Sequence, residues 1–122
     1  LIGKRILLMG VTYRQNIGDT RFSPSEEFFR FAVDEGVKIR AYDPLIFNWA
    51  EVKLDMEPEL PIPTEFDVIL FTVPHREFAE LDLAEWILGC SVLIFDANNV
   101  LTKKQVSDIR ENKLNYMSIG RG

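Results

Sequence analysis

The residues best suited to chemistry lie between positions 10 and 23, where two arginines, an aspartate and a tyrosine share one short segment. Arg14 and Arg21 carry permanent positive charge, and Asp19 lies between them. Arginines at this spacing could hold an anionic group such as a phosphate, or could form a surface ion-pair network with Asp19. Spacing alone favours neither interpretation, so the flanking elements have to be considered.

Two predicted elements flank this segment. Residues 6–9 are an apolar run that ends at Gly10, as in a strand buried on both faces. The sequence Ser23-Pro24-Ser25-Glu26 is typical of a proline-reinforced capping box, so we expect a helix over about residues 24–35. The connection is longer than the ~2–6 residues usual between strand and helix, which indicates ligand binding. Unpaired N–H groups and the helix dipole near Ser23 would favour an anion there.

The rest of the chain alternates between predicted strands and helices. Further strands are expected at residues 37–42, 68–73, 92–95 and 114–119. Helices are expected within residues 77–88 and from Thr102 or Lys103 to Asn112. Residues 45–66 carry three prolines and little periodicity, so we expect a surface excursion with one helical turn around residues 49–54. This order predicts an α/β fold, an open, doubly wound, mostly parallel Rossmann-like sheet with helices on both faces.

The amino-acid composition limits the classes of function that the chain could have. With 122 residues and 47% hydrophobic content, the chain is expected to form one domain. The net charge of -5 disfavours broad nucleic-acid binding, and no apolar run approaches the roughly 20 residues of a membrane-spanning helix. A single cysteine, Cys90, excludes an internal disulfide and multi-cysteine metal sites, and we interpret it as a small buried residue of a cytoplasmic protein. Because residue 1 is leucine, we expect a fragment of a longer chain.

A self-contained dinucleotide site has little support in the sequence. The dinucleotide fingerprint requires glycines two and five positions after Gly10, where Thr12 and Gln15 stand. Asp43 ends the second predicted strand, where an acidic residue could bind a ribose, but the following Pro44 favours a structural turn. A dinucleotide-binding domain that depends on Asp43 nevertheless stays open as an alternative.

A second alternative is a non-enzymatic α/β interaction or receiver-like module, which would need a pocket formed by Asp19, Asp43 and Asp96. His75, the only histidine, follows a predicted strand and could serve as a base. We favour a structural role for His75, in capping or packing the helix after it. No residue is predicted to be catalytic, and no metal site is predicted.

The segment Gly10-x-x-Tyr13-Arg14-x-Asn16-x-x-Asp19-x-Arg21-x-Ser23-Pro24 resembles the loop that opens the C-terminal domain of UDP-glucose and GDP-mannose dehydrogenases. Residues 36–44, 72–78, 96–101 and 119–121 resemble the same family in order and spacing. The resemblance implies that residues 1–122 are the nucleotide-sugar-binding domain of an NAD-dependent enzyme that oxidises C6 of a UDP- or GDP-linked sugar. The NAD-binding and central domains, with the catalytic residues, would lie elsewhere in a homodimeric parent, so the isolated chain would be inactive.

The resemblance also implies roles for single residues. Tyr13 and Arg14 would contact the nucleotide sugar, with Arg14 replacing the family's lysine, and Arg21 would reach NAD across a domain cleft. Asp19 and Ser23 would order the loop. We therefore expect both arginines and the positive end of the helix to converge on a negatively charged ligand.

The turn after the strand at residues 92–95 departs from the family. Asn98 and Asn99 stand where many relatives carry an arginine that reaches the substrate of the neighbouring subunit. Asn98 could hydrogen-bond a base or ribose, but its contact with a phosphate would be weaker than a charge-assisted one. The identity of the sugar and of the base is therefore left open.

Overall fold

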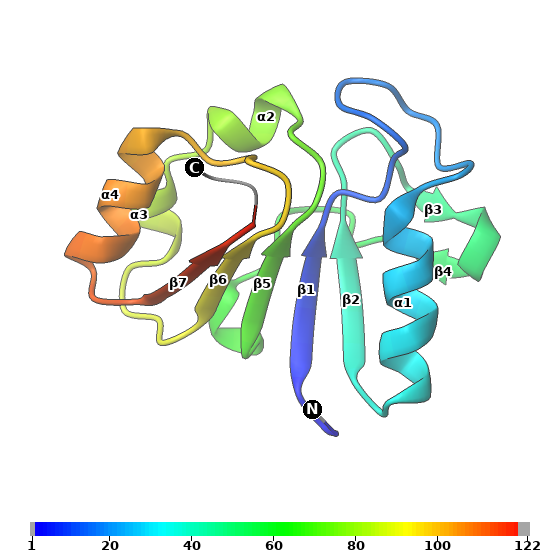
Figure 1. Cartoon of the computed structure of the whole chain (residues 1–122), viewed down its shortest axis with the longest axis horizontal. Coiled ribbons are helices and arrows are strands. Elements are labelled where there is room, and N and C mark those ends of the chain that lie inside the picture. Colours follow the sequence, from blue (N-terminus) through cyan, green and yellow to red (C-terminus); the bar gives the residue numbers. More distant parts are fainter. Residues whose placement is uncertain (1, 120–122) are drawn as a thin grey trace.

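A five-stranded parallel sheet organises the computed structural model, which describes residues 2–119 (Figure 1). The strands lie in the order β2-β1-β5-β6-β7. Their bounds are Arg5–Met9 (β1), Lys38–Tyr42 (β2), Val68–Phe71 (β5), Leu93–Asp96 (β6) and Asn115–Ser118 (β7). Counted along the chain, this is the 2-1-3-4-5 order of flavodoxin-like doubly wound sheets, whose ligands bind at the switch point between the first and third strands. The predicted α/β class is confirmed, and the switch point lies between β1 and β5.

The end of β1 depends on a glycine. Gly10 has a φ of +105°, which lies outside the range that L side chains usually adopt. A Cβ atom on Gly10 would lie 2.8 Å from the Cβ atom of Val73, just beyond β5. Glycine is therefore needed both for the turn and for the close approach of the two strand ends.

Helix α1 (Pro24–Asp34) begins where the sequence predicts and ends one residue earlier. The Ser23 hydroxyl caps the helix by accepting a hydrogen bond from the Ser25 N–H at 3.1 Å. Gly36 follows the helix with a left-handed φ of +79°. The predicted capping box is wrong in one detail, because the Glu26 side chain pairs with Arg30 at 3.1 Å. The helix start therefore rests on the serine and Pro24.

Three helices cover the opposite face of the sheet: α2 (Arg76–Ala79), α3 (Leu83–Trp86) and α4 (Lys103–Glu111). The helical content predicted within residues 77–88 is confirmed, as two short helices, because Asp82 caps a new start by accepting from the Glu85 N–H at 3.2 Å. The α4 helix begins after Thr102, with a complete capping box formed by Thr102 and Gln105. These helices and the sheet enclose a core that includes Leu7, Ile69, Phe71, Phe78, Leu83, Ile94 and Ile109.

Residues 45–66 contain more structure than the sequence predicts. The expected helical turn is present as η1 (Ala50–Val52), but it lies between two short antiparallel strands, β3 (Asn48–Trp49) and β4 (Leu54–Asp55). A second turn, η2 (Pro63–Glu65), precedes β5. The predicted surface excursion is anchored in the core, because the Trp49 side chain is fully buried, with its ring centroid 5.3 Å from that of Phe29.

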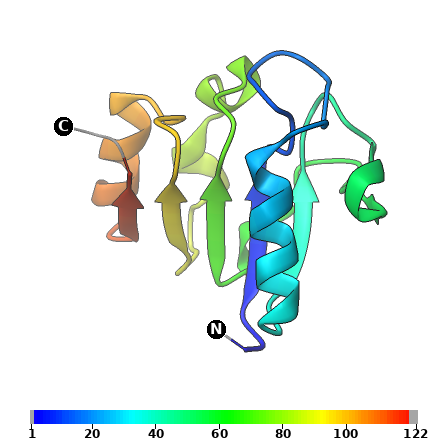
Figure 2. The same ribbon diagram turned by 45° about the vertical axis from the view of Figure 1, so that its right-hand side comes forward.

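The two faces of the sheet are covered unequally. Figure 2 shows α1 in front of β1 and β2, whereas β5, β6 and β7 have no helix on that side within residues 2–119. Over the same range, no helix is both long enough and apolar enough to cross a membrane.

Candidate functional site

A groove of about 640 Å³ opens on the α1 side of the sheet at the switch point. At its polar end lie Thr12, Tyr13, Ser25, Thr72 and Asn98, which come from the loops after β1, β5 and β6 and from the start of α1. The remainder of the groove is apolar. The polar end thus occupies the position where doubly wound sheets bind ligands.

His75 anchors the loop that leads from β1 to α1. The Nδ1 atom of His75 accepts a hydrogen bond from the Asn16 N–H at 2.9 Å, and its Nε2 atom lies 2.9 Å from Oδ2 of Asp43. Since a backbone N–H can only donate, Nδ1 carries the lone pair and Nε2 carries the proton. His75 is therefore a neutral, fully buried histidine that links the loop to the end of β2.

The structural role predicted for His75 is confirmed, through packing on the following helix and not through capping. His75 occupies the N-cap position of α2, but its side chain makes no capping hydrogen bond. Instead its ring packs on Phe78, with the centroids 5.5 Å apart. Both ring nitrogens already have partners, so His75 is not available as a general base.

Asp43 is likewise committed to the fold. Its Oδ2 atom accepts from the Val11 N–H at 2.9 Å in addition to contacting His75, and its Oδ1 atom accepts from the Leu45 N–H at 2.9 Å. The carboxylate is buried. The predicted structural turn is confirmed, and the alternative in which Asp43 binds a ribose has no exposed oxygen to support it.

The receiver-like alternative also fails. Asp19 pairs with Arg21, whereas the buried Asp96 accepts from the N–H groups of Asn98, Val100 and Leu101. Within residues 2–119, no group of three or more histidines, cysteines or carboxylates could hold a metal ion. The carboxylates therefore shape three separate turns.

Asp19 and Arg21 form a two-point ion pair within the loop. Arg21 Nε donates to Oδ1 at 3.0 Å and Nη2 to Oδ2 at 2.8 Å, while the Arg21 N–H also donates to Oδ1. The Tyr13 N–H donates to the Asp19 carbonyl at 2.8 Å. These hydrogen bonds from Arg21 lower the pKa of Asp19 to about 2. Asp19 thus ties both halves of the loop together.

This ion pair can be tested by titration. In Arg21→Ala, the pKa of Asp19 is expected to rise from about 2 toward its ordinary value of 3.8, as followed by NMR of its side-chain carbon. Because the folded pKa is depressed, the stabilising contribution is present above pH 3.8 and is lost as the pH falls through about 2. Arg40→Ala is the control, since Arg40 pairs with Glu57 and Glu65 instead. An ordinary Asp19 pKa in the unsubstituted chain would show that the pair does not form in solution.

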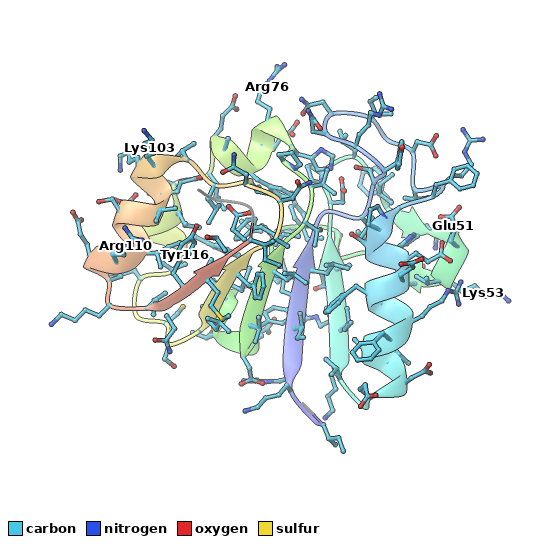
Figure 3. The ribbon with its side chains drawn as sticks, viewed as in Figure 1. Glu51, Lys53, Arg76, Lys103, Arg110 and Tyr116 are labelled. Carbon is cyan, nitrogen blue, oxygen red and sulfur yellow. The ribbon has the colours of Figure 1, made fainter. Side chains whose placement is uncertain are left out.

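Arg14 and Arg21 have different surroundings within residues 2–119. The Arg14 guanidinium carbon lies 5.2 Å from the centroid of the ring of Tyr13, a residue that lines the polar end of the groove. Arg21 instead lines a separate depression with Glu26, Glu27 and Glu51. Glu51 belongs to the η1 turn that joins β3 to β4, and its side chain is labelled there in Figure 3. The expectation that both arginines converge on one ligand is therefore not met.

The expectation of unpaired N–H groups at the start of α1 is also wrong for its first residues. Pro24 has no N–H, the Ser25 N–H donates to the Ser23 hydroxyl, and the Glu26 N–H donates to the Ser23 carbonyl at 3.1 Å. Glu26 and Glu27 in the first turn further offset the positive end of the dipole. An anion would therefore depend on Arg14 more than on this helix terminus.

Asn98 lies at the polar end of the groove, in a turn ordered by Asp96. Its Nδ2 atom donates to the Thr72 carbonyl at 3.1 Å, and the Thr72 hydroxyl donates to the Gly10 carbonyl at 2.6 Å. The ends of β1, β5 and β6 are thereby connected across the switch point. Within residues 2–119 the Asn98 side-chain oxygen accepts no hydrogen bond, so it is an acceptor that a ligand could use.

Sequence reasoning missed the importance of Asn16. Its φ is +62°, its N–H binds His75, and its Oδ1 atom accepts from the Arg76 N–H at 3.0 Å. Asparagine tolerates the left-handed conformation, which is the signal that could have identified this turn. The labelled Arg76 side chain extends away from the fold above α2 (Figure 3).

The fold and the groove together define a ligand-binding domain of the doubly wound class. Residues 7–103 match the model of the UDP-glucose/GDP-mannose dehydrogenase family, UDP binding domain. The chain belongs to this family, as its loop motif suggests.

Three relatives illustrate the match. The chain is 28% identical over 116 residues to the UDP-glucose 6-dehydrogenase of Rickettsia bellii, covering 89% of the chain and 27% of the relative. It is 30% identical over 109 residues to the UDP-N-acetyl-D-mannosamine dehydrogenase of Methanocaldococcus jannaschii, covering 84% and 24%. The solved UDP-D-ManNAc dehydrogenase of Pyrococcus horikoshii has the same fold, with a TM-score of 0.74 at 24% identity, covering 98% and 26%. The chain thus spans about a quarter of each relative.

Proposed function

We propose that this domain binds the nucleotide part of a UDP- or GDP-linked sugar at the polar end of the groove. The parent enzyme would oxidise C6 of that sugar to a carboxylate with NAD. The observation that carries the proposal is the meeting of Tyr13, Asn98 and Ser25 in one groove at the switch point, with the Arg14 charge beside Tyr13. The position and the chemistry both suit a nucleotide, which presents an aromatic base, a ribose and phosphates.

Each residue has a distinct proposed role. Tyr13 offers an aromatic face, Arg14 neutralises phosphate charge, and Asn98 accepts or donates a hydrogen bond to base or ribose. Asp19 and Ser23 act indirectly, the first by joining the two halves of the loop and the second by capping α1. Arginine at position 14 presents a planar fork where a lysine would present one ammonium, so its phosphate contact would be directional.

NAD fits this chain poorly on its own. Thr12 and Gln15 replace the glycines that a dinucleotide loop requires, and both Asp43 oxygens are occupied. In the proposed enzyme, NAD is held by the other domains, and Arg21 is the one residue of this chain assigned to it. We further propose a cytoplasmic homodimer that supplies oxidised sugar nucleotides for polysaccharide biosynthesis.

Nucleotide binding can be tested on this chain directly by calorimetric titration with UDP, GDP, their sugars and NAD. UDP or GDP is expected to bind weakly, and NAD more weakly still. Arg14→Ala should weaken binding about tenfold or more, because a hydrogen bond to a charged group contributes ~1.5–3 kcal/mol. Arg30→Ala serves as the matched control, since Arg30 pairs with Glu26 on α1 outside the groove.

Two results would overturn the proposal. One is binding of NAD in preference to every nucleotide sugar tested, which would favour a dinucleotide domain. The other is an equal loss of nucleotide affinity in Arg14→Ala and Arg30→Ala, which would place the ligand elsewhere.

A further inference from the structure

The apolar part of the groove includes a strip of the sheet that no helix within residues 2–119 covers, which we call the β5–β7 strip. Its side chains come from alternate positions of adjacent strands and face the α1 side: Val68, Leu70, Leu93, Phe95, Met117 and Ile119. Met117 and Ile119 are 51% and 58% exposed. On the opposite face of β5 and β6, Ile69, Phe71 and Ile94 are fully buried beneath helices. The strip therefore has the apolar composition of a buried sheet face, but no helix of the described residues packs on it.

Parallel sheets are almost always covered on both faces, because their strands are apolar on both sides. Such folds have a layer of helices on each face of the sheet. On the α1 face of this sheet, α1 covers only β1 and β2 (Figure 2). The strip runs across three strands, and neighbouring strands lie about 4.8 Å apart, so β5 and β7 are roughly 10 Å apart. One α-helix has a diameter of about 10 Å with its side chains. The uncovered width thus corresponds to one helix.

The shape of the strip disfavours a second copy of the chain as its cover. Phe28 and Pro24 of α1 form one wall of the groove, so α1 stands as a ridge beside the strip. A flat sheet face could not approach past that ridge. A stable dimer also buries about 800 Å² per partner, more than six side chains, several of them already half-buried, can supply. A single helix lying along the ridge fits both restrictions.

We propose that an amphipathic α-helix from the part of the parent enzyme outside residues 1–122 packs on the β5–β7 strip, alongside α1. This inference rests on the proposed function, in which the chain is about a quarter of a longer enzyme, as it is of its relatives. The helix presents aliphatic residues at i, i+3, i+4 and i+7 to Phe28, Phe95 and Met117. It also closes the groove beneath Tyr13 and Asn98, which excludes water from the nucleotide site and strengthens its electrostatic contacts.

Cysteine labelling of the parent enzyme and of the 122-residue chain tests this cover. On a Cys90→Ser background, Met117→Cys places a thiol on the strip, and Leu88→Cys places a control thiol on a residue that is 72% exposed and outside the groove. Labelling of Met117→Cys by a maleimide is expected to be at least about tenfold slower in the parent than in the isolated chain. Leu88→Cys should label at similar rates in both forms.

Equal labelling of Met117→Cys in both forms would overturn the proposal. So would concentration-dependent protection in the isolated chain together with a dimeric mass, because a second copy would then be the cover. UDP titration of the same samples separates the two hypotheses. Loss of nucleotide binding with Met117→Cys still protected would refute the proposed function but not the packed helix.

Discussion

Replacing Trp49 with alanine is expected to lower the free energy of unfolding by about 3–5 kcal/mol, the usual cost of truncating a large buried aromatic residue. The Trp49 side chain is fully buried and meets the Phe29 ring edge-on, at an interplanar angle of 63°. It also packs in the cluster that contains Leu8 of β1 and Leu70 of β5. Equilibrium urea unfolding of the 122-residue chain measures the change.

Phe47→Ala is the matched control for the tryptophan, because Phe47 lies next to the same hairpin but is 79% exposed. Its effect is expected to stay within about 0.5 kcal/mol. Trp49→Phe should cost less than the alanine variant, since it retains an aromatic ring and removes an indole N–H that has no hydrogen-bond partner among the described residues. Equal destabilisation by Trp49→Ala and Phe47→Ala would contradict the packing of the hairpin on the sheet.

Removal of His75 is the second substitution with a large expected effect. His75→Ala should destabilise the chain by roughly 3 kcal/mol, because it opens a cavity and leaves the buried Asp43 carboxylate and the Asn16 N–H each without one partner. The loop that carries Tyr13 and Arg14 should loosen at the same time. Urea unfolding and the nucleotide affinity report these two consequences separately.

Two conservative variants divide the contributions of the histidine ring. In His75→Asn, the side-chain oxygen can replace Nδ1 as the acceptor for Asn16, whereas in His75→Gln the terminal amide can replace Nε2 as the donor to Asp43. Hydrogen exchange of the Asn16 amide should therefore be fast in His75→Gln and slower in His75→Asn. Fast exchange in the unsubstituted chain would refute the hydrogen bond itself.

The central strands and α1 were predictable because their local patterns are complete. The runs that form β1, β5 and β6 are apolar on both faces, and the Ser23-Pro24 pair marks the start of α1. The hairpin around Trp49 was not predictable, because strands of two residues are too short to show a period. The break between α2 and α3 depends on one capping aspartate, Asp82, within an otherwise helical pattern.

The site was predictable in position but not in detail. The long segment after β1 indicated a ligand loop, and the structure places it at the switch point. Spacing does not determine where a loop side chain points, so the separation of Arg14 from Arg21 could not be anticipated. The contact between His75 and Asp43 joins residues 32 positions apart. It follows from topology, because β2 and β5 flank β1 and bring their carboxyl ends together.

The close approach of Gly10 to Val73 has a consequence for the history of such domains. The glycine is required by the backbone turn and by the neighbouring chain, whether or not any nucleotide is present. A descendant that had lost its enzyme partner and its ligand would still need glycine at this position to remain folded. Glycine at this position would therefore be retained with the fold, whereas Arg14, which lies beside Tyr13 in the exposed loop, would be under no such backbone requirement once binding no longer mattered.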